Sequence, residues 1–154
     1  MKLTLKVTTP DRTLINAEVD QVTVPTKEGE ITILPGHVSL MGVLAPGELS
    51  MKTDAKEEAV VVYGGFVDIR DGREVRILAD EAAHVAELDL EKAEAAHALA
   101  VRVMAEKFNP SDYEDAALAV ERELATIRVA RKWKAKGFGT STVTSGIPGA
   151  QRKE

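Results

Sequence analysis

Cysteine is absent from the 154-residue sequence, which excludes disulfide bonds and thiol chemistry and permits a reducing compartment. Aromatic residues make up only 4% of the chain, too few for a platform on which nucleic-acid bases could stack. No apolar run is long enough to cross a membrane, and the alternating start Met1-Lys-Leu-Thr-Leu-Lys6 is not a signal peptide. We therefore expect no nucleic-acid partner and only an indirect association with membranes.

The usual signatures of catalysis are also absent. The sequence has no Walker loop, no dinucleotide fingerprint and no Gly-x-Ser-x-Gly elbow. Its three histidines, His37, His84 and His97, lie far apart and match no zinc or calcium spacing. Most carboxylates fall in turns or on helix surfaces, where a solvated face accounts for them better than acid-base catalysis. We expect no catalytic residue, no metal site and no cofactor.

The first half of the chain has a period of two. Leu3, Leu5 and Val7 alternate with polar residues, and further short apolar runs continue to about residue 87, separated by Gly and Pro turn signals. Many short strands at this spacing predict an antiparallel β-sandwich or a barrel. Asp71-Gly72 predicts a hairpin turn, because glycine accepts a positive φ. Gly64-Gly65 interrupts an apolar run and predicts a bulge or a close backbone approach.

The period changes to that of a helix at Asp89, which we predict to be an N-cap. The first helix is expected over residues 90–107 and the second from Ser111, as cap of a capping box with Glu114, to about Lys134. Because Asn109-Pro110 ends the first helix and leaves a short loop, the two helices should pack as an antiparallel hairpin. Their expected apolar stripes are Ala93, Ala96, Ala100 and Val103 with Leu99 and Met104 beside them, and Tyr113, Ala117, Val120, Leu124, Ile127 and Ala130.

These patterns divide the chain into three parts. We predict a β-sandwich domain over residues 1–87, a helical hairpin over 88–136 and a flexible tail over 137–154, where Gly, Ser and Thr bury too little to offset ordering entropy. Residues 1–87 contain 9 basic and 15 acidic side chains, whereas residues 88–154 contain 11 and 10. The alanine-rich helices bury little apolar area, so the hairpin is either a weakly docked, movable element or a fixed cap.

Five motifs in a fixed order resemble the epsilon subunit of the rotary F-type ATP synthase, and a helix pair beginning Leu88-Asp89 follows them. The motifs are Glu28-Gly-Glu-Ile31, Ile33-Leu-Pro-Gly-His37, Pro46-Gly-Glu-Leu49, Gly64-Gly-Phe-Val67 and Leu78-Ala-Asp80. The resemblance implies an all-β plus α fold, in which an N-terminal antiparallel sandwich of about ten strands precedes a C-terminal two-helix hairpin.

The resemblance also implies partners and a location. Members of this family sit at the foot of the central stalk, bind the gamma subunit and the c-ring, rotate with both, and supply no catalytic residues. The resemblance therefore implies a peripheral position on the cytoplasmic side of the cell membrane, or on the stromal side of the thylakoid membrane in a plastid.

Two residues of the first motifs are candidate partner contacts by this resemblance. Glu30 would contact the c-ring loops and His37 the gamma stalk. The alternatives are an ordinary charged turn residue for Glu30 and, for His37, a turn histidine that bonds a local carbonyl.

The family's hairpin can also extend along gamma and inhibit ATP hydrolysis. Its basic second helix then approaches acidic segments of the alpha and beta catalytic subunits. The candidate contacts lie in the basic run of residues 122–136, although cations near a helix C-terminus also favour its dipole. They are Arg122, Arg128, Arg131, Lys132 and Lys134.

Some bacterial members bind ATP through an Ile/Leu-Asp-x-x-Arg-Ala motif and two arginines four residues apart on the second helix. This chain offers Asp89, Lys92 and Ala93 for the motif, Arg122 for the first arginine, and Thr126 in place of the second. Lysine lacks the planar fork that grips phosphate at two points, and one cation is missing. We therefore expect ATP binding to be weak or absent.

Together these observations predict an epsilon subunit that couples the gamma stalk to the c-ring in proton-driven ATP synthesis and whose helices can inhibit hydrolysis. The alternative is a stand-alone β-sandwich interaction module with a fixed helical cap.

Overall fold

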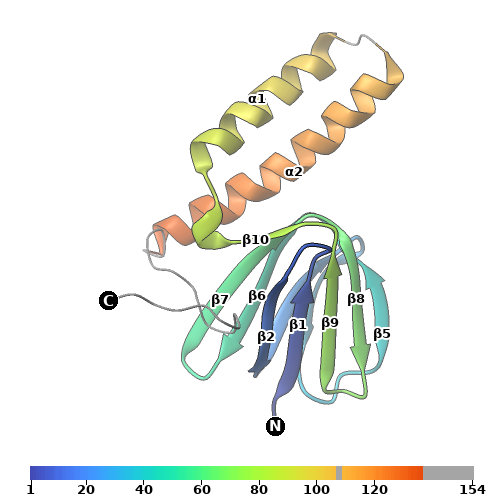
Figure 1. Cartoon of the computed structure of the whole chain (residues 1–154), viewed down its shortest axis with the longest axis vertical. Coiled ribbons are helices and arrows are strands. Elements are labelled where there is room, and N and C mark those ends of the chain that lie inside the picture. The colour runs from blue at the N-terminus through green and yellow to red at the C-terminus, as the bar shows by residue number, and fades with distance from the viewer. Residues whose placement is uncertain (107–108, 137–154) are drawn as a thin grey trace.

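Two five-stranded sheets pack face to face, and two long helices follow them, in the computed structural model, which describes residues 1–106 and 109–136 (Figure 1). The first sheet has the strand order β2 (Thr13–Val19), β1 (Leu3–Thr8), β9 (Glu74–Ala79), β8 (Gly65–Arg70) and β5 (Leu40–Val43). The second has the order β10 (Ala82–His84), β7 (Lys56–Val62), β6 (Gly47–Thr53), β3 (Gln21–Thr26) and β4 (Gly29–Ile33). The predicted sandwich is confirmed, and a barrel is excluded because the sheets remain separate.

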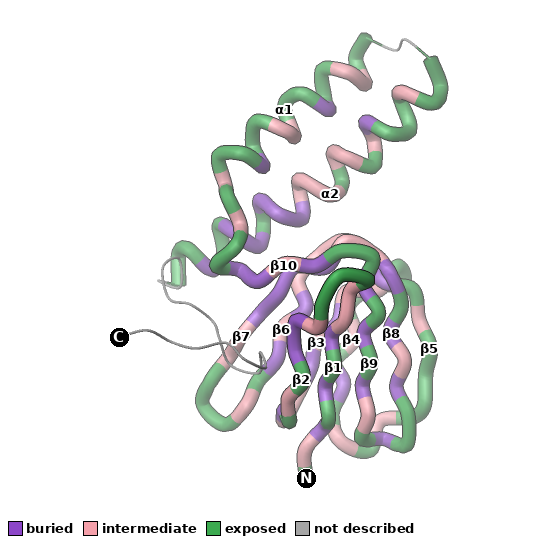
Figure 2. Tube along the Cα trace, in the orientation of Figure 1, coloured by how far each residue is buried: buried purple, intermediate pink, exposed green. Residues whose placement is uncertain are grey.

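Alternating side chains of both sheets form the sandwich core. Leu3, Leu5 and Val7 are fully buried, while Thr4 and Lys6 between them are exposed (Figure 2). This is the period that the sequence shows, and it places one face of each strand between the sheets. One pairing differs from the antiparallel expectation, because β1 and β9 run parallel. A parallel pair needs a long connection, and here the chain passes through the second sheet between the two strands.

The predicted hairpin turn at Asp71-Gly72 is confirmed and joins β8 to β9. Both residues have positive φ, 53° and 65°, and the Arg73 amide donates to the Arg70 carbonyl over 3.1 Å. The turn packs against the Pro35-Gly36 turn that follows β4. The Gly36 amide donates to the Gly72 carbonyl over 2.7 Å, so a turn from each sheet is tied to the other.

Gly65 confirms the predicted close backbone approach. Its φ is +118°, and a Cβ built at this position would lie 2.1 Å from the carbonyl oxygen of Leu78 on β9. No side chain fits this distance, so glycine is needed both for the backbone conformation and for the pairing of β8 with β9.

After a short 3-10 turn, η1 (Val85–Glu87), the chain forms the helices α1 (Leu90–Glu106) and α2 (Pro110–Ala135). Asp89 is the predicted cap, since its Oδ1 accepts from the Lys92 amide over 3.1 Å. The capping box at Ser111 is wrong. Asn109 caps α2 instead, accepting from the Asp112 amide over 2.8 Å, and Pro110 occupies the first turn, where its fixed φ suits a helix start.

The apolar stripe predicted for α2 is correct only in part. Ile127 and Ala130 are buried as expected, but Tyr113 is 43% exposed. The helix also buries a second face, which carries Thr126, Val129 and Trp133 (Figure 2). The predicted stripe covered one face of α2, whereas the helix contacts both α1 and the sandwich and so buries two. The tail prediction falls on residues 137–154, which lie outside the described residues, and the domain limits at 87 and 136 remain predictions.

Candidate functional site

The candidate site lies where the helical hairpin contacts the sandwich. The C-terminal part of α2 contacts β6 and β7 of the second sheet, and α1 packs on α2 (Figure 1). We call the contact surface between α2 and the sheet the seam.

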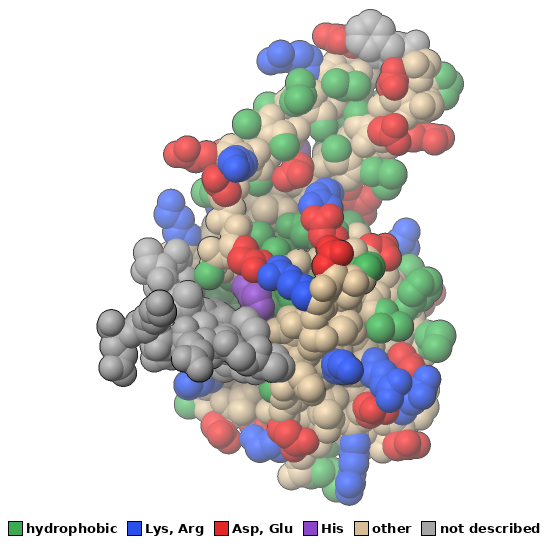
Figure 3. Space-filling view, viewed as in Figure 1, with side chains coloured by type: hydrophobic (Ala, Val, Ile, Leu, Met, Phe, Trp, Pro, Cys, Tyr) green, Lys and Arg blue, Asp and Glu red, His purple; other side chains and the backbone are tan. Residues whose placement is uncertain are grey.

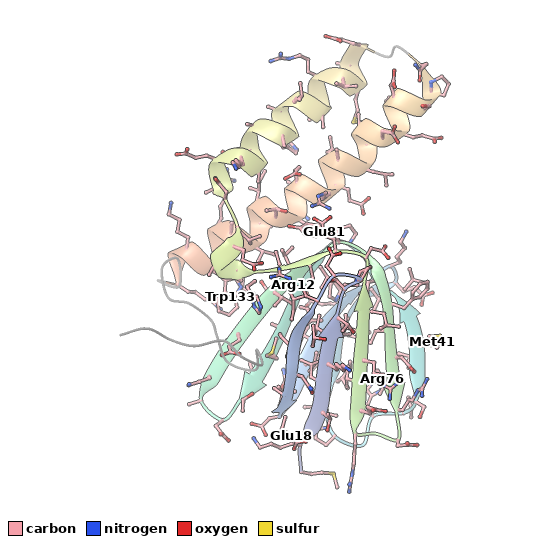
Figure 4. The ribbon with its side chains drawn as sticks, viewed as in Figure 1. Arg12, Glu18, Met41, Arg76, Glu81 and Trp133 are labelled. Atoms are coloured by element: carbon pink, nitrogen blue, oxygen red, sulfur yellow. The ribbon has the colours of Figure 1, made fainter. Side chains whose placement is uncertain are left out.

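Trp133 anchors the seam near the C-terminal end of α2 (Figure 4). Its side chain is 1% exposed and packs with Ala59 and Val61 of β7. The indole Nε1 donates to Glu48 Oε2 over 3.0 Å, and Lys132 Nζ lies 2.8 Å from the other oxygen of the same carboxylate. The hydrogen bond to Glu48 raises the pKa of the Lys132 ammonium. One carboxylate of β6 therefore holds two neighbouring residues of α2.

A second set of contacts lies toward the middle of α2. The Tyr63 and Thr126 hydroxyls are 2.6 Å apart, and the Arg122 guanidinium lies 4.1 Å from the centre of the Tyr63 ring. Arg122 also forms a two-point ion pair with Glu81, one arm of which, Nη1 to Oε1, measures 2.9 Å. The Arg122 hydrogen bonds lower the pKa of the Glu81 carboxyl. Burial raises the pKa of Tyr63.

The four residues proposed for nucleotide binding lie around one cavity beside these contacts. Asp89, Lys92, Ala93 and Arg122 line a space of about 310 Å³, and Thr126 lines it as well. The sequence motif thus converges in three dimensions. The fork of Arg122, however, already grips Glu81, and the hydroxyl of Thr126 is bonded to Tyr63. The other carboxylates that line the cavity are Glu87 and Glu123.

The charge of this cavity opposes a phosphate chain. Four carboxylates line it, those of Glu81, Glu87, Asp89 and Glu123, against the two cations Lys92 and Arg122. The Glu87 carboxylate is itself held by the Arg12 guanidinium at 2.8 and 2.9 Å. These hydrogen bonds lower the Glu87 pKa.

The basic run of α2 does not form one face in this structure. Arg122 pairs with Glu81, Lys132 with Glu48 and Lys136 with Glu57, all on the sandwich. Arg131 instead reaches Glu94 of α1 at 3.3 Å. Arg128 and Lys134 are exposed, and neither forms an ion pair with a described residue.

Glu30 and His37 lie toward opposite ends of β4. Glu30 is exposed one residue after the strand begins, opposite Pro25, whereas His37 closes the turn beyond the strand's other end. The His37 amide donates to the Leu34 carbonyl over 3.0 Å, and its Nδ1 lies 2.7 Å from the Val38 carbonyl. The two candidates are therefore not brought together, and the local bond foreseen as the alternative for His37 is present.

The outer face of the first sheet carries an apolar strip that the sequence analysis did not single out. Val43, Phe66 and Leu78 stand side by side across β5, β8 and β9, because they are register partners. Their exposures are 46%, 52% and 54%, and Met41 beside them is 69% exposed. Hydrophobic side chains gather over this edge of the molecule in Figure 3. We call these four residues the apolar strip.

Comparison with known proteins assigns the fold to a family. The family model described as "ATP synthase, Delta/Epsilon chain, beta-sandwich domain" matches residues 2–85. The chain belongs to the ATP synthase delta/epsilon family. The resemblance stated from its motifs is therefore confirmed.

Relatives in this family cover most of the chain. The ATP synthase epsilon chain of Dehalococcoides mccartyi strain CBDB1 is 38% identical over 132 residues, 85% of this chain and 94% of the relative. That of Chloroflexus aggregans is 35% identical over 136 residues, 88% and 97% of the two chains. A chain in the cryo-EM structure of the Euglena gracilis mitochondrial ATP synthase, OSCP/F1/c-ring, has a TM-score of 0.74 at 26% identity, covering 87% of this chain and 81% of that one.

In this delta/epsilon family member, the residues that hold the seam on the sandwich side could not be predicted from the sequence. Glu48, Tyr63 and Glu81 lie in different elements and share no motif. A signal existed on the helix, where Arg122, Thr126, Val129 and Trp133 recur at spacings of three and four residues. No helix in the described part of the chain is long and apolar enough to cross a bilayer.

Proposed function

We propose that this chain is the non-catalytic epsilon subunit that couples the gamma subunit to the c-ring in ATP synthesis, and that its helices inhibit ATP hydrolysis. The observation that carries the coupling role is the apolar strip. Exposed apolar side chains that form a contiguous group mark interaction surfaces, whereas isolated ones do not. Because the relatives of this chain are ATP synthase subunits, we assign the gamma subunit as the partner of this surface. The chain would then reach the membrane peripherally, through the complex.

The turn at Pro35-Gly36 is our proposed contact to the c-ring. It lies at the end of the sandwich away from the helices, flanked by the exposed Leu34 and Val38. The hydrogen bond from Gly36 to Gly72 stiffens it. His37 would contribute from this turn. Glu30, which faces outward near the other end of β4, would contact a different part of the stalk or ring.

Substitution of Phe66 by aspartate tests the coupling role. Phe66 lies in the middle of the apolar strip, so a charge there should weaken gamma binding about 30-fold, the effect of losing ~2 kcal/mol at a central aromatic residue. The measurement is the affinity of the purified chain for gamma. Thr32→Asp adds the same charge at an exposed strand position of the second sheet and should bind as the wild type does. Equal affinity for both variants would reject this surface.

The seam supports the inhibitory role. Three cations of α2, Arg122, Lys132 and Lys136, are held by carboxylates of the sandwich, so detachment of the helix would free them. They would add to Arg128 and Lys134, which are already exposed. The released helix would present a basic surface to acidic segments of the alpha and beta subunits. In the alternative module with a fixed cap, the seam would never open.

We further propose that ATP is not a tight regulatory ligand of this subunit, because Glu81 occupies the Arg122 guanidinium and the cavity's four carboxylates outnumber its two cations. Calorimetry should detect no micromolar binding to the wild type. The double variant Lys92→Arg with Glu81→Gln restores the forked cation and frees Arg122, so ATP binding should strengthen about tenfold or more. Glu81→Gln with Lys134→Arg is the matched control, since Lys134 lies away from the cavity. Micromolar binding by the wild type would contradict this proposal.

A further inference from the structure

The outer face of the first sheet is ordered in rows, because strand register sets the side chains of neighbouring strands opposite one another. One row contains Thr8, Leu78, Phe66 and Val43, and the last three belong to the apolar strip. The next row lies two residues along each strand, about 7 Å away. It contains Asn16, Lys6, Arg76, Asp68 and Met41. The apolar strip therefore borders a row of charged side chains.

Two cations stand opposite each other in the charged row. Lys6 of β1 and Arg76 of β9 are register partners, and both residues are exposed. Like charges at directly opposed positions of a sheet repel each other, so this pairing costs stability in the isolated chain. The stability of the free chain therefore gives no reason for this arrangement.

The neighbouring carboxylates leave this pair of cations with unused donors. The Asp68 carboxylate, beside Arg76 in the row, accepts from the Arg70 Nε over 2.7 Å. Glu74 Oε1 lies 3.0 Å from one nitrogen of the Arg76 guanidinium, Nη2. In the part of the chain that the structure describes, Lys6 forms no ion pair. The Lys6 ammonium and the other N–H groups of Arg76 can therefore donate to a further acceptor.

The carboxylate of β2 on this face is also engaged. Glu18, diagonal to Lys6, accepts from the Thr4 hydroxyl over 3.0 Å. Figure 3 shows the two kinds of surface together, because Lys and Arg side chains gather directly below the hydrophobic side chains at this edge of the molecule. Arg76 and Met41 mark the charged row in Figure 4.

An apolar strip beside two cations defines the chemistry of the partner that fits it. A partner surface that covers the strip must offer apolar side chains of its own. Next to them it must offer negative charge, because charges across an interface are arranged to be complementary and a cation there would meet Lys6 and Arg76.

We propose that the gamma subunit, the partner assigned to the apolar strip, places an acidic side chain on this row, where its carboxylate bridges Lys6 and Arg76 while apolar neighbours cover Phe66. The carboxylate would accept charge-assisted hydrogen bonds from both cations, and exclusion of water by the strip would strengthen them. The repulsion between the two cations would be relieved only in the complex and would therefore favour binding. This inference rests on the proposed coupling role, because it specifies the chemistry of that partner.

Substitution of Lys6 by glutamine tests the bridge. Lys6→Gln should weaken gamma binding about fivefold, and Lys6→Glu should weaken it more, because it sets a carboxylate against the partner's own. Raising the salt from about 0.1 M to about 1 M should weaken binding of the wild type more than that of Lys6→Gln, since salt screens the bridge. Lys52→Gln removes the same charge from an exposed position of the second sheet and should bind as the wild type does. Equal affinity and equal salt dependence for Lys6→Gln and the wild type would overturn the proposal.

The stability of the free chain separates a role in binding from a role in folding. Because Lys6→Gln removes a repulsion, urea unfolding of the isolated variant should show a stability at least equal to that of the wild type. A lower stability would show that Lys6 supports the sandwich itself and would overturn the proposal. If Phe66→Asp weakens gamma binding while Lys6→Gln does not, the acidic contact is wrong and the coupling role stands. If Phe66→Asp binds as the wild type does, both fail.

A zero-length carbodiimide cross-linker identifies the partner's carboxylate, because it joins an amine only to a carboxylate in direct contact. In the assembled complex it should link Lys6 to an Asp or Glu of gamma, located by mass spectrometry, whereas Lys52 should not link to gamma. Cross-links from Lys6 to its own chain alone would overturn the proposal. Binding of the isolated chain to phosphatidylserine vesicles that is lost in Lys6→Gln would assign the two cations to a lipid surface and would overturn it as well.

Discussion

Replacing Trp133 with alanine is expected to detach the helical hairpin and to lower ATP hydrolysis by the assembled complex. Trp133 is the largest buried side chain of the seam, and truncating a buried tryptophan typically costs about 3–5 kcal/mol. The Glu48 carboxylate would also lose the indole donor at 3.0 Å. The docked population should therefore fall by at least about 100-fold relative to the detached one, given 1.4 kcal/mol per tenfold change.

Fluorescence energy transfer between a dye on the tip of the hairpin and one on the sandwich measures detachment, and the same variants are assayed for hydrolysis. Tyr113→Ala removes an exposed aromatic of the same helix and should leave both readouts unchanged. A complex assembled with a chain ending at Glu87, which lacks the helices, should hydrolyse ATP faster than the complex with the wild-type chain. If Trp133→Ala detaches the hairpin while hydrolysis keeps the wild-type rate, the inhibitory role is wrong.

Gly65→Ala is expected to destabilise the sandwich severely. The new methyl would lie 2.1 Å from the Leu78 carbonyl oxygen, so β8 and β9 would have to separate, and φ of +118° is itself unfavourable for alanine. Backbone strain of about 1–3 kcal/mol and overpacking of about 1–3 kcal/mol together approach the whole stability of many domains.

Gly29→Ala is a matched control for this effect. Gly29 has nearly the same φ, +119°, but a Cβ there would meet no atom within 4 Å. Urea unfolding of both variants, followed by circular dichroism, separates strain from contact. Gly29→Ala should lower the free energy of unfolding by the backbone strain alone. Gly65→Ala should lower it by at least about 1 kcal/mol more. Similar losses would show that the approach of β9 is not what requires glycine at position 65.

The sandwich could be predicted from the sequence because its signals are local. The alternation of Leu3, Leu5 and Val7 with polar residues predicts a half-buried strand. The pair Asp71-Gly72 predicts the turn that follows β8. The parallel pairing of β1 with β9 could not be predicted in this way, because nothing near either strand specifies a partner some seventy residues away. The apolar strip was hidden for a similar reason, since Val43, Phe66 and Leu78 become neighbours only through strand register.

The contacts of the seam, which join residues distant in the sequence, were also beyond prediction. The motif residues Asp89, Lys92 and Arg122 do converge on one cavity, as the family resemblance implies. The motif does not include Glu81, a residue of the sandwich whose carboxylate accepts hydrogen bonds from the Arg122 guanidinium. Helical periodicity could have identified Trp133 as part of a second apolar face. It could not have identified Glu48 of β6, whose carboxylate accepts the indole hydrogen bond.

The spacing of the two seam contacts along α2 has a mechanical consequence. Arg122 and Trp133 are 11 residues apart (133 − 122), about 16 Å of helix, and the C-terminal end of α1 and the N-terminal end of α2 lie away from the sandwich (Figure 1). A force applied at those ends of the helices loads the Arg122–Glu81 pair before Trp133, so the two contacts break one after the other. A partner that pulls on this end of the hairpin would therefore need only the force that opens one contact at a time, although at equilibrium both contacts together hold the hairpin.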